Sequence, residues 1–125
     1  MVQFELSVEV EEKHIDALSH VNNIVYLQWV QEVAGAHWFS VAGKNSGYIW
    51  VVRKHEIEYF KPAFKGDILS LRTWVEKMEG FRSIRRVDIL RGEEVLCSCT
   101  TNWIALDSDN LRPKRIEEPF QTAFE

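Results

Sequence analysis

The stretch Asp16-Ala17-Leu18-Ser19-His20-Val21-Asn22-Asn23 leads directly into a long apolar segment, Tyr26 to Ala42. This segment has no proline, and its polar residues Gln28, Gln31 and Glu32 recur three or four positions apart. That spacing predicts a helix with one narrow polar stripe, enclosed nearly all round by the rest of the protein. The polar stretch therefore ends at a helix N-terminus, where free backbone N–H groups favour negative charge.

Two asparagines at the start of the predicted helix and one glycine within it have structural roles that follow from their residue types. Asn22 or Asn23 can cap the first turn of the helix through its side-chain oxygen. Gly35 would weaken the helix by about 1 kcal/mol relative to alanine. We therefore expect Gly35 to allow the close approach of a neighbouring backbone.

The polar stretch, followed by Tyr26, resembles the motif of hotdog-fold acyl-CoA thioesterases of the 4-hydroxybenzoyl-CoA thioesterase type. In that family an aspartate precedes Gly-His-Val-Asn-Asn and the long helix, so Ser19 stands where glycine is common. A second block is similar to the family's Tyr-x-x-Pro turn between the second and third strands, and a third fits near the end of the chain. These blocks are Tyr59-Phe60-Lys61-Pro62-Ala63 with Gly66-Asp67, and Ala105-Leu106-Asp107 with Arg112-Pro113. Glu117 departs from the family, which commonly has proline there.

Composition limits the class of protein. With 125 residues, of which 46% are hydrophobic, the chain fits one folded domain over residues 1–125. A net charge of -4 argues against a general nucleic-acid binder, which needs a broad positive surface. No apolar run is long enough to span a membrane, and the first five residues do not resemble a signal peptide. We expect a cytoplasmic protein with no membrane association.

The sequence predicts neither a disulfide nor a metal site. Cys97 and Cys99 are two apart in a strand-like run, about 6.5 Å along the strand, so we expect two buried thiols. His14, Asp16 and His20 are of metal-ligand types, but no fourth ligand has a suitable spacing. We expect no metal and no cofactor.

Alternation of apolar and polar residues predicts five strands, near residues 4–12, 48–60, 68–78, 83–90 and 95–106. Short breaks between the last three imply antiparallel neighbours. A short helix is expected within residues 113–124, limited by Pro119. The predicted fold is α+β, the hotdog fold, in which a curved antiparallel sheet wraps around one long central helix. Its open edges, like the family resemblance, predict a homodimer or homotetramer with the active site between subunits.

Thioester hydrolysis needs a group that attacks the carbonyl or activates water, donors for the oxyanion, and a slot for the acyl chain. No Gly-x-Ser-x-Gly elbow is present. The resemblance makes Asp16 the catalytic group, as nucleophile or general base; spacing alone favours a helix-flanking turn residue. The backbone N–H of Asn23 or Ile24 is the expected oxyanion donor, worth about 3 kcal/mol. His20 or Asn22 could add a contact, and His20 could instead hold the turn together.

Substrate-binding residues are predicted from their chemistry. Tyr26 is expected to line the acyl slot, although Tyr26, Trp29 and Tyr59 are also ordinary core residues. Coenzyme A carries phosphates, which need basic side chains. Lys61 and the strand that begins Arg82-Ser83-Ile84-Arg85-Arg86 are the best candidates, the alternative being a solvated strand face.

The sequence therefore predicts an acyl-CoA thioesterase that releases a free acid and CoA. One alternative is a thioesterase acting on acyl groups carried by acyl carrier protein. Another is a non-catalytic hotdog protein that binds acyl-CoA without hydrolysing it. A hotdog hydratase would need a different arrangement of histidine and acid, which the sequence does not contain.

Overall fold

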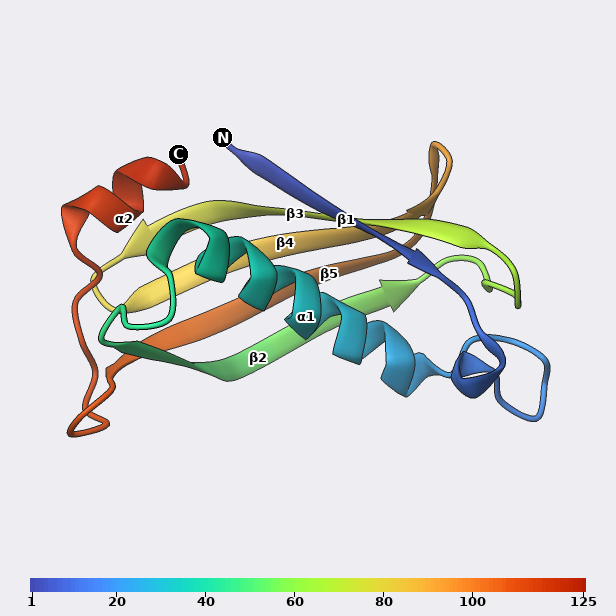
Figure 1. Cartoon of the computed structure of the whole chain (residues 1–125), viewed down its shortest axis with the longest axis horizontal. Helices are drawn as coiled ribbons and strands as arrows, with labels where there is room; N and C mark the ends of the chain where they lie inside the picture. The colour runs from blue at the N-terminus through green and yellow to red at the C-terminus, as the bar shows by residue number, and fades with distance from the viewer.

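A computed structural model describes the whole chain, residues 1–125. The elements follow one another as β1 (Gln3–Glu9), the 3-10 turn η1 (Glu12–His14), α1 (Asn23–Ala42), β2 (Tyr48–Tyr59), β3 (Ile68–Glu79), β4 (Arg82–Arg91), β5 (Glu94–Asp107) and α2 (Glu118–Ala123). All five strands form one antiparallel sheet in the order β1-β3-β4-β5-β2. Helix α1 lies lengthwise on one face of this sheet (Figure 1). The predicted hotdog architecture is confirmed.

Helix α1 begins three residues earlier than its apolar pattern alone predicts. The side chain of Asn22 accepts a hydrogen bond from the Ile24 N–H at 3.0 Å, which makes Asn22 the N-cap. At the other end the helix stops at Gly43, which has a φ of +71°. A positive φ costs glycine little and terminates the helix there.

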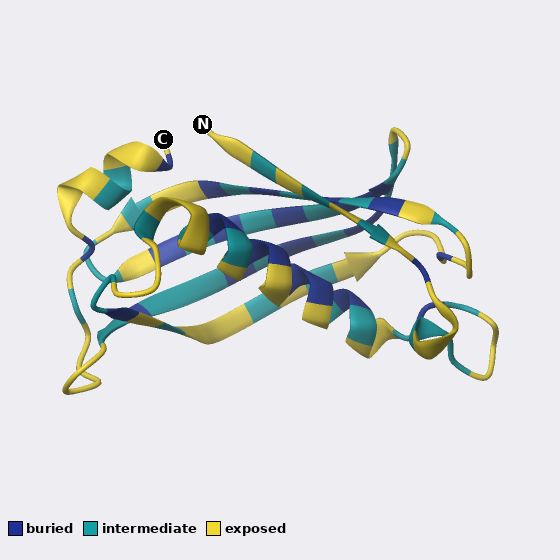
Figure 2. Ribbon diagram, in the orientation of Figure 1, coloured by how far each residue is buried: buried dark blue, intermediate teal, exposed yellow.

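One face of α1 is not covered by its own chain. Tyr26, Trp29 and Val33 are buried, whereas the opposite face, including Ile24 and Phe39, is exposed (Figure 2). The expectation that the helix is enclosed nearly all round is wrong for a single chain, because one curved sheet covers only one side. The expected backbone neighbour of Gly35 is also absent: a Cβ at that position would meet nothing within 4 Å.

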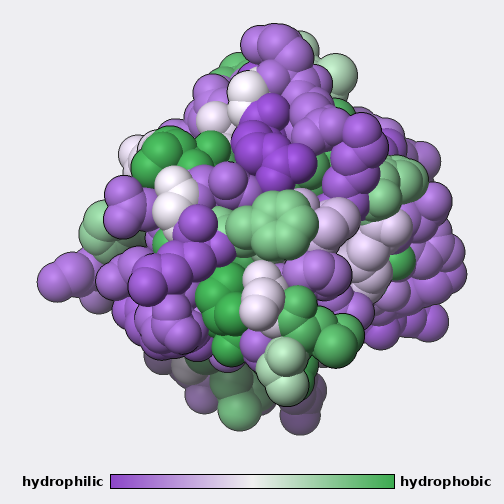
Figure 3. All heavy atoms as spheres, turned by 90° about the vertical axis from the view of Figure 1, so that its right-hand side faces the viewer, coloured by the Kyte–Doolittle hydropathy of each residue, from purple (hydrophilic) through white to green (hydrophobic).

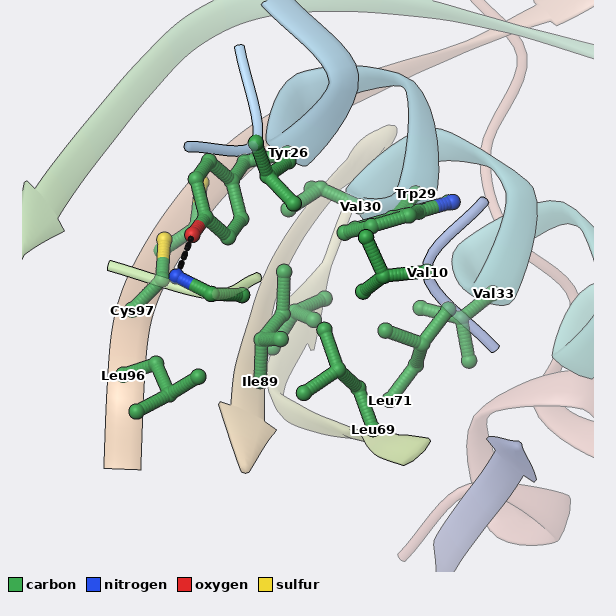
Figure 4. Close-up of a cluster of buried hydrophobic side chains, with 14 residues drawn as sticks. Val10, Tyr26, Trp29, Val30, Val33, Leu69, Leu71, Ile89, Leu96 and Cys97 are labelled. Carbon is green, nitrogen blue, oxygen red and sulfur yellow. Dashed lines mark hydrogen bonds between the residues drawn. The ribbon is translucent and has the colours of Figure 1, made fainter. Parts of the chain in front are cut away.

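The main core fills the space between α1 and the sheet (Figure 4). It combines helix residues with the inward-facing residues of β3, β4 and β5, among them Val30, Val33, Leu69, Leu71, Ile89, Leu96 and Cys97. Both cysteines are free and buried, as predicted. Burial raises the pKa of Cys97 to about 12, so this thiol is protonated at neutral pH and is a poor nucleophile.

Strand β2 forms an open edge of the sheet. It pairs only with β5, and Ile49, Val51 and Val52 on it are exposed apolar side chains. An unpaired edge with an apolar stretch of this kind is a surface on which another strand can pair. No helix of the chain is both long and apolar enough to cross a membrane. The terminal helix α2 is shorter than the predicted range, since Pro119 occupies its first turn.

Candidate functional site

Asp16 lies at the start of a tight turn that an isolated bridge between Ile15 and Val21 closes. Its backbone N–H donates to the His20 carbonyl at 2.9 Å. Its Oδ1 accepts from the Leu18 N–H at 2.9 Å and more weakly from the His20 N–H at 3.4 Å. Oδ2 has no hydrogen-bond partner. The turn therefore fixes the carboxylate through one oxygen and leaves the other free.

Ser19, at the tip of this turn, has a φ of +64°. A side chain in this left-handed region costs roughly 1–2 kcal/mol, which glycine avoids. This accounts for the preference for glycine at the corresponding position of the family that the sequence resembles. The structure shows that serine is accommodated there without opening the turn, because the Ser19 N–H still donates to the Asp16 carbonyl at 3.1 Å.

Replacing Ser19 by glycine should stabilise the protein by about 1 kcal/mol, since the positive φ is no longer opposed by a Cβ. Urea unfolding measures this change. Ser7 on strand β1 is a matched control, because Ser7→Gly loosens an extended residue and should destabilise the protein slightly. Equal or lower stability of Ser19→Gly would show that the turn is not strained at this residue.

Ala63 joins the two sequence blocks that carry the resemblance. Its carbonyl accepts a hydrogen bond from the Val21 N–H at 3.0 Å, and its N–H donates to the Tyr26 hydroxyl at 3.1 Å. The second of these bonds is the dashed line of Figure 4. Ala63 is completely buried. The connection after β2 is thereby fastened to both the Asp16 turn and the first turn of α1.

The start of α1 leaves one candidate oxyanion donor. The Ile24 N–H is taken by the Asn22 side chain at 3.0 Å, so it is not available to a substrate. The Asn23 N–H has no hydrogen-bond partner. Oδ1 of Asn22 accepts the capping bond, and the side-chain amide nitrogen is the donor that this residue can still offer to an oxyanion.

A hollow of about 370 Å³ brings most of the predicted site residues together. Six of the eight line it, namely Asp16, His20, Asn22, Asn23, Tyr26 and Lys61. It lies at the end of the molecule where α1 begins and β2 ends, the end that faces the viewer in Figure 3, where apolar patches are set among polar side chains. Its apolar lining includes Leu18, Val21, Phe60 and Pro62, which belong to the two sequence blocks but were not predicted as site residues.

The aromatic residues of the hollow have distinct environments. The His20 ring packs edge-on against Phe64, with 5.3 Å between ring centroids, and its nitrogens make no hydrogen bond within the chain. Tyr26 is buried, and burial raises the pKa of its hydroxyl. Tyr59 is partly exposed, and its hydroxyl donates to the Asn23 carbonyl at 3.3 Å. Tyr59 therefore supports the first turn of α1 from strand β2.

The predicted basic residues do not gather around Asp16 in one chain. Lys61 lines the hollow, but its ammonium group pairs with Glu94, which also pairs with Arg91 at 2.8 Å. Arg82 and Ser83 line a different hollow of about 700 Å³ at the opposite end of the sheet. The structure also gathers no set of three histidine, cysteine or acidic side chains that could hold a metal ion.

A buried polar cluster between α1 and the sheet was missed by sequence reasoning. Arg85 Nη1 donates to His37 Nδ1 at 2.9 Å and to the Thr73 hydroxyl at 3.1 Å. Burial, and then the charge of Arg85, lowers the pKa of His37 to about 4. Burial also lowers the pKa of Arg85 to about 10, so the guanidinium is charged and the imidazole neutral at pH 7. The only feature of the sequence that indicated this cluster was the alternation of inward- and outward-facing positions along β4, which places Arg85 on the inner face.

Comparisons with known proteins agree with this fold. The family model of the thioesterase superfamily matches residues 18–98. The long-chain acyl-CoA thioesterase FadM of Escherichia coli is 24% identical, covering 94% of each chain. An oleoyl-acyl carrier protein thioesterase of Arabidopsis thaliana is 28% identical over 76% of this chain, which spans only 30% of the plant protein. A 1,4-dihydroxy-2-naphthoyl-CoA thioesterase from Synechocystis has the same fold, with a TM-score of 0.83, 20% identity, and 98% and 96% of the two chains covered.

Proposed function

Because the chain belongs to the thioesterase superfamily, we propose that it hydrolyses acyl-CoA thioesters to a free acid and CoA, with Asp16 as the catalytic carboxylate. The observation that carries this proposal is the pairing of two free groups in one hollow. Asp16 presents an oxygen with no partner, and the Asn23 N–H has no acceptor. A nucleophile or base and an oxyanion donor are the two groups that thioester hydrolysis requires.

In the proposed reaction the thioester carbonyl lies between these two groups. Oδ2 of Asp16 either attacks the carbonyl carbon or removes a proton from a water molecule that attacks it. Negative charge develops on the carbonyl oxygen, which the Asn23 N–H and the N-terminal end of α1 stabilise by about 3 kcal/mol. In the general-base route the C–S bond then breaks, the thiolate of CoA takes up the proton, and the oxygen from water remains in the acid. In the nucleophilic route departure of the thiolate leaves a mixed anhydride between Asp16 and the acyl group, and a water molecule hydrolyses it to the free acid and the restored carboxylate.

The open edge of β2 supports a dimer as the working unit. Twofold pairing of two β2 edges is antiparallel, so the Tyr59 end of one strand lies beside the Tyr48 end of the other. The hollow that contains Arg82 and Ser83 lies toward the Tyr48 end of β2. This follows from the strand register, because Arg82 on β4 pairs with Ile104 on β5, and Ile104 pairs with Val51 near the start of β2. In such a dimer these residues approach the Asp16 hollow of the second copy. Arg82 then joins Lys61 as a contact for the phosphates of CoA, whereas Ser83, only 3% exposed, is too buried to reach them.

Ile49→Lys combined with Val51→Lys should convert the dimer to a monomer and lower hydrolysis by roughly tenfold or more, because two charges would have to be buried at the paired edge. Light scattering after gel filtration measures the mass. Exchanging the charges of Glu5 and Arg72, which pair across β1 and β3 at the opposite edge of the sheet, is the matched control, since it keeps the net charge. A monomer with full activity would contradict the proposed dimeric site.

The proposed activity is tested with purified protein and a panel of acyl-CoA thioesters, with release of thiol as the readout. The same acyl groups on acyl carrier protein are assayed in parallel, since the similarity to the plant enzyme favours that carrier as the second candidate. Turnover of acyl-CoA supports the proposal. Turnover of the protein-borne thioesters alone would favour the second candidate. Tight binding without turnover would indicate a non-catalytic acyl-CoA-binding protein.

A further inference from the structure

A small pocket lies between α1 and the sheet, separate from the Asp16 hollow. It holds about 60 Å³, and we name it the Trp pocket after its three indole rings. The side chains that line it are Trp38, Trp50, Met78, Ser83, Arg85 and Trp103, with Ala34 and Gly35 of α1 beside them. Gly35 is 12 residues beyond Asn23, which corresponds to about 18 Å of helix. The Trp pocket is therefore too distant to belong to the reacting centre of the same chain.

The polar groups around the Trp pocket can all donate hydrogen bonds, and most lack an acceptor. The Ser83 hydroxyl is in a residue only 3% exposed and has no partner in the chain. The indole N–H groups of Trp50 and Trp103 are buried without an acceptor. Indole and guanidinium groups can only donate, so the lining has an excess of donors.

Arg85 adds a positive charge that no acid neutralises. It is 4% exposed, its only hydrogen-bonding nitrogen is Nη1, and it takes part in no ion pair. A buried charge without a counterion is costly, and arginine pairs best with a carboxylate through two parallel hydrogen bonds. Nε and Nη2 of Arg85 are free to make such bonds. The chain itself supplies no carboxylate to the pocket.

We propose that the Trp pocket binds a carboxylate attached to an apolar molecule, with Arg85 as its counterion and Ser83 as an additional donor. The volume accommodates a carboxylate and little more. The apolar part of the ligand lies against the indole rings and leaves past Gly35, where a Cβ would meet nothing within 4 Å. The absence of a side chain at Gly35 therefore keeps the mouth of the pocket open.

Two sources can supply this carboxylate. One is a free carboxylic acid from solution, which does not depend on the proposed function. The other is a carboxylate at the far end of an acyl chain long enough to reach from the Asp16 hollow, and this source rests on the proposed function. The recognition chemistry at Arg85 is the same for both.

Titration of tryptophan fluorescence with hexanoate and with hexanol tests the proposal, since three of the five tryptophans line the pocket. In the wild type hexanoate should bind at least roughly tenfold more tightly than hexanol, as expected for a charge-assisted pair. Arg85→Met should remove this preference. Gly35→Leu should block both ligands. Arg72→Met, on the outer face of the sheet, should leave both affinities unchanged.

Equal affinity of the wild type for hexanoate and hexanol, or binding of neither, would overturn the proposal. Survival of the preference in Arg85→Met would also overturn it. Replacing an unpaired buried charge by methionine is often neutral or stabilising, so the variant should fold, and thermal unfolding verifies this. Gly35→Leu keeps Arg85 in place and provides an independent test.

The source is identified by comparing two long-chain acyl-CoA substrates, one ending in a carboxylate and one in a methyl group. A roughly tenfold higher kcat/KM for the carboxylate form, lost in Arg85→Met, assigns the pocket to the acyl chain. No preference, together with binding of hexanoate, assigns it to a free acid. Failure to hydrolyse either substrate contradicts the proposed function and leaves the hexanoate result standing.

Discussion

Asp16→Asn should lower kcat for acyl-CoA hydrolysis by about a thousandfold or more. Asparagine keeps an oxygen that can accept the hydrogen bonds from the Leu18 and His20 N–H groups, so the turn should be preserved. Its amide nitrogen can neither attack a carbonyl nor accept a proton. The variant therefore separates loss of chemistry from loss of structure, which thermal unfolding checks.

Asp109→Asn serves as the control for Asp16→Asn, because Asp109 is exposed and lies outside the hollow. Unchanged turnover in Asp16→Asn would refute the catalytic assignment. A single turnover in isotopically labelled water separates the two roles of Asp16. Label appears in the Asp16 carboxylate if it is the nucleophile, and only in the released acid if it is a general base.

The free energy of unfolding should fall by up to about 3 kcal/mol as the pH is lowered from 6.5 to about 4, through His37. In the folded protein burial, and then Arg85, lowers the pKa of His37 from its ordinary 6.5 to about 4. Over this interval the unfolded chain binds a proton that the folded protein does not. This contribution is complete above pH 6.5 and is lost toward pH 4.

Denaturant unfolding at a series of pH values measures the His37 contribution. Carboxylates also titrate in this range, so the informative quantity is the difference between the wild type and His37→Gln. Glutamine retains an acceptor for Arg85 but does not titrate, and the slope of stability against pH should flatten. Identical slopes in the two proteins would contradict the assignment to His37.

The strand pattern was predictable because one face of each strand is buried. Leu6, Val8 and Val10 alternate with polar residues. The glycines Gly80 and Gly92 interrupt the strand pattern, and they mark the turns of the β3–β4 and β4–β5 hairpins. The enclosure of α1 was not predictable. Apolar residues such as Ile24 and Phe39 look the same in sequence whether their own chain covers them or leaves them exposed.

The candidate site was predictable where its residues are close in sequence. Asp16 and Asn23 flank one turn, and Lys61 belongs to a block that Ala63 fastens to this turn. Arg82 was harder to place, because a strand crosses the whole molecule and its sequence does not say which end lies near the turn. Arg85 was included in a basic strand, and the alternation along that strand did not separate it from its solvent-facing neighbours until the pairing of β4 was known.

Ala63 also determines how this end of the protein can open. Its two backbone bonds hold the β2–β3 connection against the Asp16 turn and the Tyr26 hydroxyl. When that connection lifts away, both bonds break together, so local opening releases the carboxylate turn and the start of α1 as one cooperative unit. Substitutions that loosen the connection would then change the entry and departure of ligands without altering any group that takes part in the reaction.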